Sequence, residues 1–403
     1  MIPYSDFTFF GILFLFLIPA IVLGFLGKGI RGYAFFMHFV FIWLIFGNNS
    51  QELYSLVIYV LYQWMVLCLY FKYKDQNWTY PIALLFSLLP LVLVKITPVL
   101  SPHSTLGFLG VSYLTFKNVQ IIIEAKDQLI KDITPYEFFD FLLFFPTISS
   151  GPIDRYRRYG KDAQIEWTDK QYGEFLFQGI HRLFQGFLYK YILAYLINRY
   201  WLPLKFLQDR PVAAFVYHSY QQFFHYFFTL AQFKTFVSAV LYMYGYSLYL
   251  FFDFAGYTAF AVGVSYILGI KTPENFNRPF ISRNIKEFWN RWNMTLSFWF
   301  RDYVFMRVVF ALTRKKVLKS RQIISYIGYL SLFGLMGFWH GLAWHYIVYG
   351  LYHAALFIGY DLFDRFNKKC NIWKNNVYFR GLSVVITFHF VCFGFLIFSG
   401  YLF

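Results

Sequence analysis

Long apolar runs separated by short polar connections dominate this chain. A helix needs about 20 apolar residues to cross the bilayer core. Runs near that length lie close to residues 8–27, 33–47, 53–71, 80–99, 105–124, 174–200, 212–232, 235–251, 254–270, 322–338, 344–363 and 381–403. Some of these runs are short or merge, so the pattern predicts about eleven membrane spans and an all-α polytopic fold. We expect residues 1–403 to form a single integral-membrane domain.

Two stretches depart from this pattern. Residues 135–150, PYEFFDFLLFFPTISS, are apolar but short, and basic connections flank them on both sides. This arrangement predicts a re-entrant segment, whose irregular backbone must be enclosed by protein. Residues 271–321 are rich in Lys, Arg, Trp and Phe, and their acidic residues are Glu274, Glu287 and Asp302. We expect this second stretch to form an interfacial platform on the cytosolic face.

Within the platform, the sequence from Asn284 to Tyr303 predicts one amphipathic helix. Asn284 is a favourable N-cap, and an acidic residue three positions later suits the positive end of the helix dipole. Polar residues then recur at three- and four-residue steps and form one stripe, which consists of Glu287, Asn290, Asn293, Ser297 and Arg301. The stripe either lies in water at the membrane interface or lines a polar cavity, with Asn293 as the main candidate.

Composition supports a membrane protein and sets its orientation. Apolar residues make up 59% of the chain, charged residues make up 14%, and the mean hydropathy is +0.47. The net charge of +16 comes from Lys and Arg in short connections. That distribution is typical of cytosolic loops and of attraction to anionic lipid or an acidic partner, and it argues against nucleic acid as a partner. Lys28, Arg31, Lys72 and Lys74 follow the first and third runs, so the N-terminus is expected outside.

His340 stands out within the segment MGFWHGLAWH at 336–345. An ionisable residue in a membrane run is costly and is a functional-site hypothesis by default. The alternative is a neutral histidine bonded to a backbone carbonyl, which also accounts for His38, His225 and His389. Three features favour function at His340: flanking glycines that permit close approach, flat walls from tryptophan, and a second polar site at Asn293. These glycines and tryptophans are Gly337, Gly341, Trp339 and Trp344.

A lone His and an Asn suit acyl transfer to a hydroxyl. A neutral His in a low-dielectric site accepts the proton of an attacking alcohol, and an Asn amide orients the ring or donates to a developing oxyanion. A metal centre is poorly supported because His340 and His345 are five residues apart, without an HExxH pattern. The three scattered cysteines do not form a disulfide or redox framework. The chain is therefore expected to bind no metal and no cofactor of its own.

The segments that carry these residues resemble the membrane-bound O-acyltransferase family. FWNRWNMTLSFWFRDYVFMR at 288–307 is similar to the first family motif, with Asn293 at its variable Asn/His position. GFWHG at 337–341 is similar to the second, with His340 at the catalytic position. FFPTISSGPIDRYRRY at 144–159 and NFNRPFISRNIKEFWNRW at 275–292 resemble the branch of the family that acts in teichoic-acid D-alanylation. Members of that branch often carry His where this chain has Asn293, so a two-histidine mechanism is excluded.

The resemblance implies a fold and a reaction. The implied fold is a ring of spans around a thinned centre with a tunnel that holds His340. The tunnel is supported by Trp339, Gly341, Trp292, Ser297 and Arg301. In a bacterial plasma membrane, D-alanine would arrive as a phosphopantetheine thioester on an acidic carrier protein. It would leave toward lipoteichoic acid, directly or through an accessory membrane relay protein. Arg301 could reach a phosphate of the pantetheine arm or an inner-leaflet lipid, and its neighbour Asp302 is expected on another helix face.

A docking surface for the carrier is predicted just after the stripe. Residues 302–312 continue the platform helix, and its apolar edge is followed by basic residues that would complement an acidic helix. The expected docking residues are Met306, Val309, Phe310, Arg314, Lys315 and Lys316. Alternatively, the apolar edge packs on the membrane and the basic run is a solvated cytosolic loop.

Two other functions stay open at this point. One is a polysaccharide O-acetyltransferase with another acyl donor, which would share the His340 and Asn293 core. The other is a transporter or flippase without a covalent step. A transporter would normally show interrupted helices and charges along a path, whereas charges inside the apolar runs are few here.

Overall fold

The computed structural model describes residues 1–100, 107–205, 230–316, 318–374 and 376–403. Within these ranges all regular secondary structure is helical, which confirms the predicted all-α class. Most of the predicted span at 212–232 lies outside the described residues.

The described chain divides into two compact units. The first unit comprises Met1–Gly186, Tyr257–Phe276 and Asn293–Arg307, and the second comprises Phe187–Gly256, Asn277–Trp292 and Val308–Phe403. The predicted platform at 271–321 is therefore shared between them, with its residues alternating between one unit and the other. The description of residues 1–403 as one functional domain stays a prediction.

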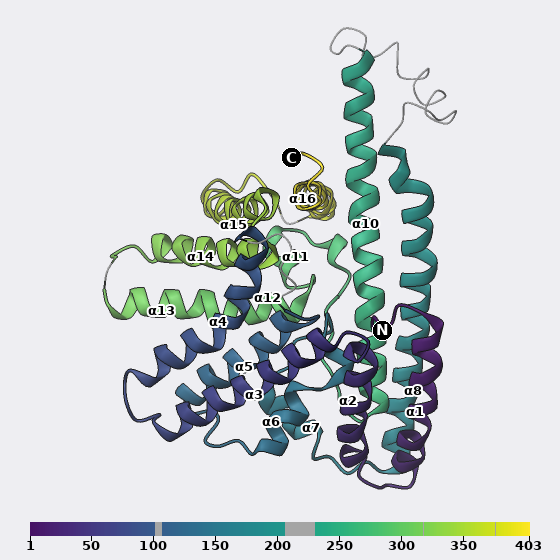
Figure 1. Ribbon diagram of the computed structural model, residues 1–403. Helices are drawn as coiled ribbons and strands as arrows, with labels where there is room; N and C mark the ends of the chain where they lie inside the picture. The colour runs from purple at the N-terminus through teal and green to yellow at the C-terminus, as the bar shows by residue number, and fades with distance from the viewer. Residues whose placement is uncertain (101–106, 206–229, 317, 375) are drawn as a thin grey trace. The chain divides into compact units, whose positions relative to one another are not determined.

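The first unit is a bundle in which α1 and α8 lie side by side (Figure 1). Its elements are α1 (Phe7–Phe25), α2 (Arg31–Phe46), α3 (Ser50–Lys72), α4 (Thr79–Leu100), α5 (Val111–Lys126), α6 (Pro135–Leu142), the 3-10 turn η1 (Phe145–Thr147), α7 (Tyr156–Asp162), α8 (Asp169–Gly186), the end of α10 (Leu230–Ile267), α12 (Met294–Phe300) and the π-helical turn η7 (Arg301–Phe305). Buried polar side chains join α3, α4 and α5: Asn118 donates to Gln63 at 2.6 Å and to Ser87 at 3.0 Å. Hydrogen bonds of this kind hold helices together where lipid cannot satisfy polar groups.

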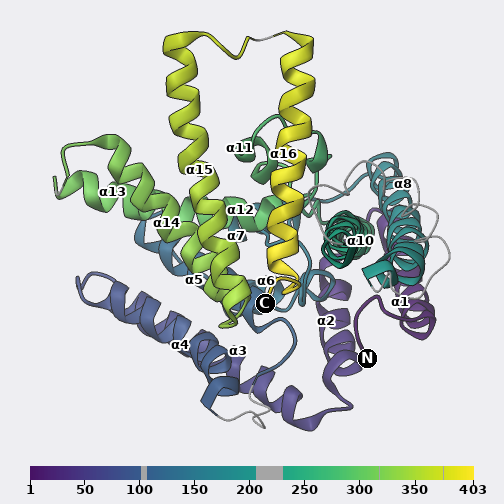
Figure 2. The ribbon, with the colours of Figure 1, turned by 90° about the horizontal axis from the view of Figure 1, so that it is seen from above.

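The second unit contains the C-terminal helices. Its elements are η2 (Phe187–Ala194), η3 (Ile197–Trp201), η4 (Leu202–Lys205), the start of α10, η6 (Pro279–Ile281), α11 (Ile285–Trp289), most of α13 (Met306–Arg314), α14 (Arg321–His340), α15 (Trp344–Cys370) and α16 (Val377–Phe398). Figure 2 shows α15 and α16 running side by side. Glycines bring α14 against α15, because a Cβ at Gly350 would lie 2.3 Å from the carbonyl oxygen of Phe333.

Six described helices are long and apolar enough to cross a membrane, which supports a multi-pass membrane protein. They are Phe7–Phe25, Ser50–Lys72, Thr79–Thr97, Phe236–Ile267, Arg321–His340 and Val377–Phe398, and Arg31–Phe46 is a shorter apolar helix. The predicted runs at 235–251 and 254–270 are not separate helices, since both lie mainly in α10. The total of about eleven spans stays a prediction.

Side-chain caps explain where several helices begin. The Asn284 side chain accepts a hydrogen bond from the backbone N–H of Glu287, which confirms the predicted N-cap of α11. Asn376 accepts from the backbone N–H of Phe379 in the same way. At α6, Thr134 and Glu137 form a reciprocal capping box ahead of Pro135. These residues satisfy N–H groups that a helix terminus would otherwise leave without a partner.

The predicted re-entrant segment at 135–150 is short and irregular. It forms the eight-residue α6 and the three-residue η1, and most of its side chains from Phe138 to Ser149 are buried. Protein encloses this backbone, as such a stretch would require if it lay at membrane depth. Its entry and exit on one membrane face stay a prediction.

Candidate active site

Asn293 lies at a break between two helices. α11 ends at Trp289 and α12 begins at Met294, so the predicted continuous helix over 284–303 is wrong. Asn293 has φ 42° and ψ 52°, a left-handed conformation that Asn tolerates better than most residues. A left-handed residue interrupts a right-handed helix, so the predicted polar stripe is divided: Glu287 and Asn290 precede the break, and Ser297 and Arg301 follow it.

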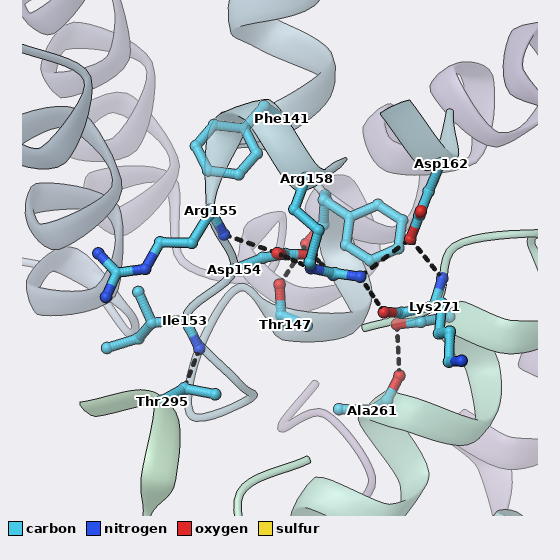
Figure 3. A network of polar contacts seen from close by, with 12 residues as sticks. Phe141, Thr147, Ile153, Asp154, Arg155, Arg158, Asp162, Ala261, Lys271 and Thr295 are labelled. Atoms are coloured by element: carbon cyan, nitrogen blue, oxygen red, sulfur yellow. Dashed lines mark hydrogen bonds and ion pairs between the residues drawn. The ribbon is translucent and has the colours of Figure 1, made fainter. Parts of the chain in front are cut away.

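Two side chains fix the turn that carries Asn293. The Thr295 hydroxyl donates to Oδ1 of Asn275 at 2.6 Å, and the backbone N–H of Met294 donates to the carbonyl of Asn275 at 2.9 Å. Thr295 Oγ1 also accepts from the backbone N–H of Ile153 at 2.9 Å (Figure 3). Asn293 itself is only 7% exposed, and its side chain makes no hydrogen bond in the described part of the chain. The turn therefore holds a buried amide that is available to a ligand.

A buried charged network supports the same region (Figure 3). Arg158 donates from Nε to Asp154 at 2.7 Å and from Nη1 to Asp162 at 2.9 Å. Lys117 of α5, only 1% exposed, donates to the carbonyl of Phe141 at 3.0 Å. Burial raises the pKa of the Asp154 carboxyl, while the neighbouring guanidinium of Arg158 opposes that rise. This network ties residues 144–162 to α5 and positions Ile153 at the Asn293 turn.

The end of α12 differs from the prediction at Arg301 and Asp302. These adjacent residues were expected on different helix faces, but Arg301 Nε donates to Asp302 Oδ1 at 2.9 Å. The π-helical turn at Arg301–Phe305 changes the local geometry, and Arg155 Nη2 also donates to Asp302 at 3.0 Å. The guanidinium of Arg301 packs over the Phe298 ring at 4.6 Å. The Arg301 side chain is exposed, and its guanidinium already forms an ion pair with the Asp302 carboxylate.

His340 is the last residue of α14, within the second unit. Its half-buried ring lies against aromatic neighbours at centroid distances of 4.5 Å for Trp339, 4.9 Å for Phe398 and 6.0 Å for Tyr346. The following Gly341 is extended, and a Cβ there would meet the Tyr346 ring at 2.7 Å. These contacts confirm close backbone packing at the glycines. Trp344 is 73% exposed, so its predicted role as a wall beside His340 is not supported.

Trp292 and Ser297, which were also predicted to support the tunnel, belong to different units. Trp292 is buried in the second unit, with its ring 5.6 Å from Phe288 and 4.7 Å from Phe395. Ser297 is buried on α12 in the first unit. Because Asn293 belongs to the first unit and His340 to the second, their pairing in one site stays a prediction. Among the described residues, no group of three or more His, Cys, Asp or Glu could hold a metal ion.

The predicted docking residues lie at the end of the helical stretch. Met306, Val309 and Phe310 fall at steps of three and four on α13, which places them on one helix face. Phe310 is 61% exposed. The basic residues Arg314, Lys315 and Lys316 follow at the end of α13, and all three are exposed. The helix therefore has the predicted combination of an apolar face and a basic end.

Comparison with known proteins decides the family. The sequence model for membrane-bound O-acyltransferases matches residues 42–403. The chain belongs to the membrane-bound O-acyltransferase family. It is therefore an acyltransferase, which favours the enzyme hypothesis over a transporter.

The similar proteins include D-alanyltransferases and O-acetylases. The chain is 50% identical to a teichoic acid D-alanyltransferase of Bacillus subtilis, over 99% of this chain and 98% of the relative. It is 41% identical to the enzyme of that name from Lacticaseibacillus rhamnosus, over 99% and 97%. A probable alginate O-acetylase of Pseudomonas aeruginosa is 28% identical over 71% of this chain and 47% of the relative.

The acyltransferase also contains a buried histidine that sequence reasoning missed. His353 of α15 is fully buried, and its Nδ1 accepts a hydrogen bond from the indole of Trp289 at 3.2 Å. The sequence offers no local signal for this pair, since the two residues are 64 positions apart. Three other histidines were expected to bond backbone carbonyls, and one of them, His225, lies outside the described residues. His389 bonds Val385 O at 2.7 Å, whereas His38 instead lies 3.3 Å from the Asp140 carboxylate.

Proposed function

We propose that this acyltransferase moves D-alanine from a carrier-protein thioester on the cytosolic side to a teichoic-acid hydroxyl on the outer face. The observation that carries the proposal is the 50% identity to a teichoic acid D-alanyltransferase over almost the whole of both chains. A match of that extent includes the segments at 144–159 and 275–292, which hold the Asn293 turn and the α11 cap.

The proposed chemistry needs one proton acceptor and no metal. His340 accepts the proton of the acceptor hydroxyl as its oxygen attacks the thioester carbonyl carbon. The C–S bond then breaks, an ester forms, and the released thiolate takes up a proton to become the free thiol of the phosphopantetheine arm. General-base assistance of this type accelerates a reaction by about 10²–10⁴-fold. The aromatic rings packed against half-buried His340 support this role because apolar neighbours favour the neutral form of the imidazole.

In this proposal, the amide of Asn293 donates to the oxyanion that develops on the thioester carbonyl. A neutral donor stabilises that charge without adding one of its own. The Thr295 and Asn275 contacts hold the turn in place, so the amide is preorganised. This role requires Asn293 and His340 to face one tunnel at the thinned centre of a ring of about eleven spans, as the family resemblance implies.

The carrier protein is proposed to dock on α13. The apolar face of Met306, Val309 and Phe310 would receive a helix, and Arg314, Lys315 and Lys316 would attract its acidic side chains. The phosphopantetheine arm would then enter from the cytosolic side of the bacterial plasma membrane. The N-terminus would lie on the outer side, because the basic loops that follow the first and third apolar runs favour the cytosolic side. The acceptor is lipoteichoic acid or an accessory membrane protein that relays the acyl group.

An O-acetyltransferase acting on a polysaccharide is the second candidate. It is favoured by the 28% identity to a probable alginate O-acetylase. That match covers 71% of this chain and 47% of the relative, compared with nearly full coverage for the D-alanyltransferases. The two candidates share the proposed base and differ in the acyl donor.

The decisive experiment measures D-alanyl ester on the cell-wall polymer in cells that carry His340→Ala. We expect the ester to fall close to background, while the membrane level of the protein and its capture of the carrier stay normal. His389→Ala is the matched control, because His389 is exposed and bonds only its own helix in the described structure. Normal ester content in His340→Ala would show that His340 is not the general base. An unmutated protein that neither binds the carrier nor supports ester formation would point to the acetyl donor instead.

A further inference from the structure

A cavity of about 640 Å³ lies inside the second unit between α15 and α16. Figure 2 shows these two helices side by side. Its walls come from α15, α16, the connection between them and the residues that begin α11. Neither His340 nor Asn293 lines it. The cavity is therefore formed by residues that the acyl-transfer proposal does not use.

The lining changes from apolar to basic along the helices. Leu356, Ile386 and Phe390 line the part of the cavity near the middle of α15 and α16. Lys374 and Arg380 line the part beside the helix connection. From Leu356 to Asn367 along α15 is about 17 Å at 1.5 Å per residue. A ligand that fits this gradient is an amphiphile with an apolar chain and an anionic head.

Hydrogen bonds hold the polar end of the cavity in a defined shape. Asn367 donates from Nδ2 to the carbonyl of Trp373 at 3.0 Å and accepts from its backbone N–H at 2.6 Å. The indole of Trp373 donates to Oγ of Ser383 on α16 at 2.9 Å. These contacts bridge α15, the connection and α16. The entrance is thus preorganised, which reduces the entropy that a ligand must overcome.

The charge at this end is positive. Asp364, the last acidic residue in this sequence, also lines the cavity, but its carboxylate is already paired with Lys368 at 2.6 Å. Lys374 is exposed and forms no ion pair in the described part of the chain. Arg283 also lines the cavity, although Glu287 lies 3.4 Å from its Nε. An excess of Lys and Arg places this connection on the cytosolic side, where the membrane surface carries anionic lipid.

We infer that this cavity binds an anionic glycerophospholipid of the cytosolic leaflet. One acyl chain lies between α15 and α16, and the phosphate lies against Lys374 and Arg380. Trp373 and Tyr360 of the lining suit the headgroup level, where aromatic side chains accumulate. Bound lipid would fill the space between α16 and α15, the helix that follows His340 in the chain. This role goes beyond the proposed transfer reaction.

The test compares lipids retained by the full-length protein from mixed vesicles. The protein is reconstituted in equal amounts of phosphatidylglycerol and phosphatidylcholine, extracted in mild detergent and analysed by native mass spectrometry. We expect retained phosphatidylglycerol to exceed phosphatidylcholine. Lys374→Gln and Arg380→Gln should each reduce that preference by about fivefold, since one basic residue contributes this much near a membrane surface. Lys369 lies in the last turn of α15 but does not line the cavity, so Lys369→Gln should leave the preference for phosphatidylglycerol unchanged.

A second pair of variants tests the apolar part without changing charge. A Cβ at Gly359 meets nothing within 4 Å, and Gly359 lines the cavity, so Gly359→Leu fills the space. Gly381 has equal room and does not line the cavity, so Gly381→Leu is its control. We expect lower lipid retention in Gly359→Leu alone. The inference is overturned if wild type retains the two lipids equally, or if Lys369→Gln reduces the preference for phosphatidylglycerol as much as Lys374→Gln and Arg380→Gln do. It is also overturned if Gly359→Leu retains as much lipid as wild type. Displacement of the lipid by inorganic phosphate would also overturn it, because the site would then recognise the headgroup alone.

Discussion

The indole of Trp289 donates a hydrogen bond to Nδ1 of His353 at 3.2 Å, with 64 residues between them in the chain. Trp289 ends α11, directly before the break that carries Asn293, and His353 lies in the middle of α15. Both side chains are buried, and a Cβ at Gly394 would lie 2.9 Å from the other ring nitrogen of His353. This bond therefore joins the end of α11 to the helix that follows His340.

Loss of either partner in this pair should destabilise the protein. We expect His353→Phe to lower the free energy of unfolding by about 1–3 kcal/mol, because a buried N–H is left without an acceptor. The double variant with Trp289→Phe should cost less than the sum of the two single variants, since both polar groups are then removed. Denaturant unfolding of the detergent-solubilised protein measures all four forms. Strictly additive costs would show that the hydrogen bond contributes nothing.

The glycines between α14 and α15 give a second prediction. A Cβ at Gly350 would lie 2.3 Å from the backbone oxygen of Phe333, and backbone cannot move aside cheaply. We expect Gly350→Ala to cost about 1–3 kcal/mol of stability and to reduce acyl transfer, because α14 carries His340 at its end. Gly334→Ala is the matched control on α14, where nothing lies within 4 Å. The control should be neutral or stabilising by up to about 1 kcal/mol. Equal unfolding free energies for both variants would contradict the close packing.

Local patterns in the sequence predicted most helices of the fold. Apolar length located α1, α3, α14 and α16, and a polar N-cap located the start of α11 at Asn284. Such signals succeed because hydrophobic length and capping depend on a few neighbouring residues.

Features that depend on backbone irregularity or distant contacts could not be predicted in this way. A 3.6-residue periodicity continues through Asn293 in the sequence, but it does not reveal the left-handed backbone that ends the helix. The same periodicity does not reveal the π-helical turn that brings Arg301 to Asp302. His353 was missed because a lone histidine in an apolar run gives no indication of a partner 64 residues away. The candidate residues His340 and Asn293 came from motifs, whereas their supporting contacts came only from tertiary structure.

The ion pairs at α11 predict a pH dependence of stability. Burial alone would raise the pKa of Glu287, but the backbone N–H of Arg283 and the guanidinium of Arg291 hold that pKa below its ordinary value. A carboxyl whose pKa is lowered by folding stabilises the protein above the ordinary pKa of about 4.3. This contribution disappears as the pH falls through the lower folded value. Wild type should therefore unfold at a higher temperature than Glu287→Gln at pH 7, and the difference should vanish at lower pH. Exposed Glu166→Gln is the control, and a difference between wild type and Glu287→Gln that does not shrink as the pH falls below about 4.3 would disprove the linkage.

The left-handed backbone of Asn293 allows its structural role to be separated from its chemical one. Asn293→Gly keeps the favourable left-handed conformation and removes the amide, whereas Asn293→Ala should lose about 1–2 kcal/mol of stability from backbone strain. Asn293→Asp keeps the size and the polar oxygen but has no amide N–H when ionised. Because the buried amide makes no hydrogen bond in the described part of the chain, we expect Asn293→Gly to fold like wild type. D-alanyl ester formation should nevertheless fall by about 10²–10³-fold in both the Gly and Asp variants, as for the loss of one oxyanion donor. Wild-type ester formation in Asn293→Gly would instead show that Asn occupies this position for its backbone conformation alone.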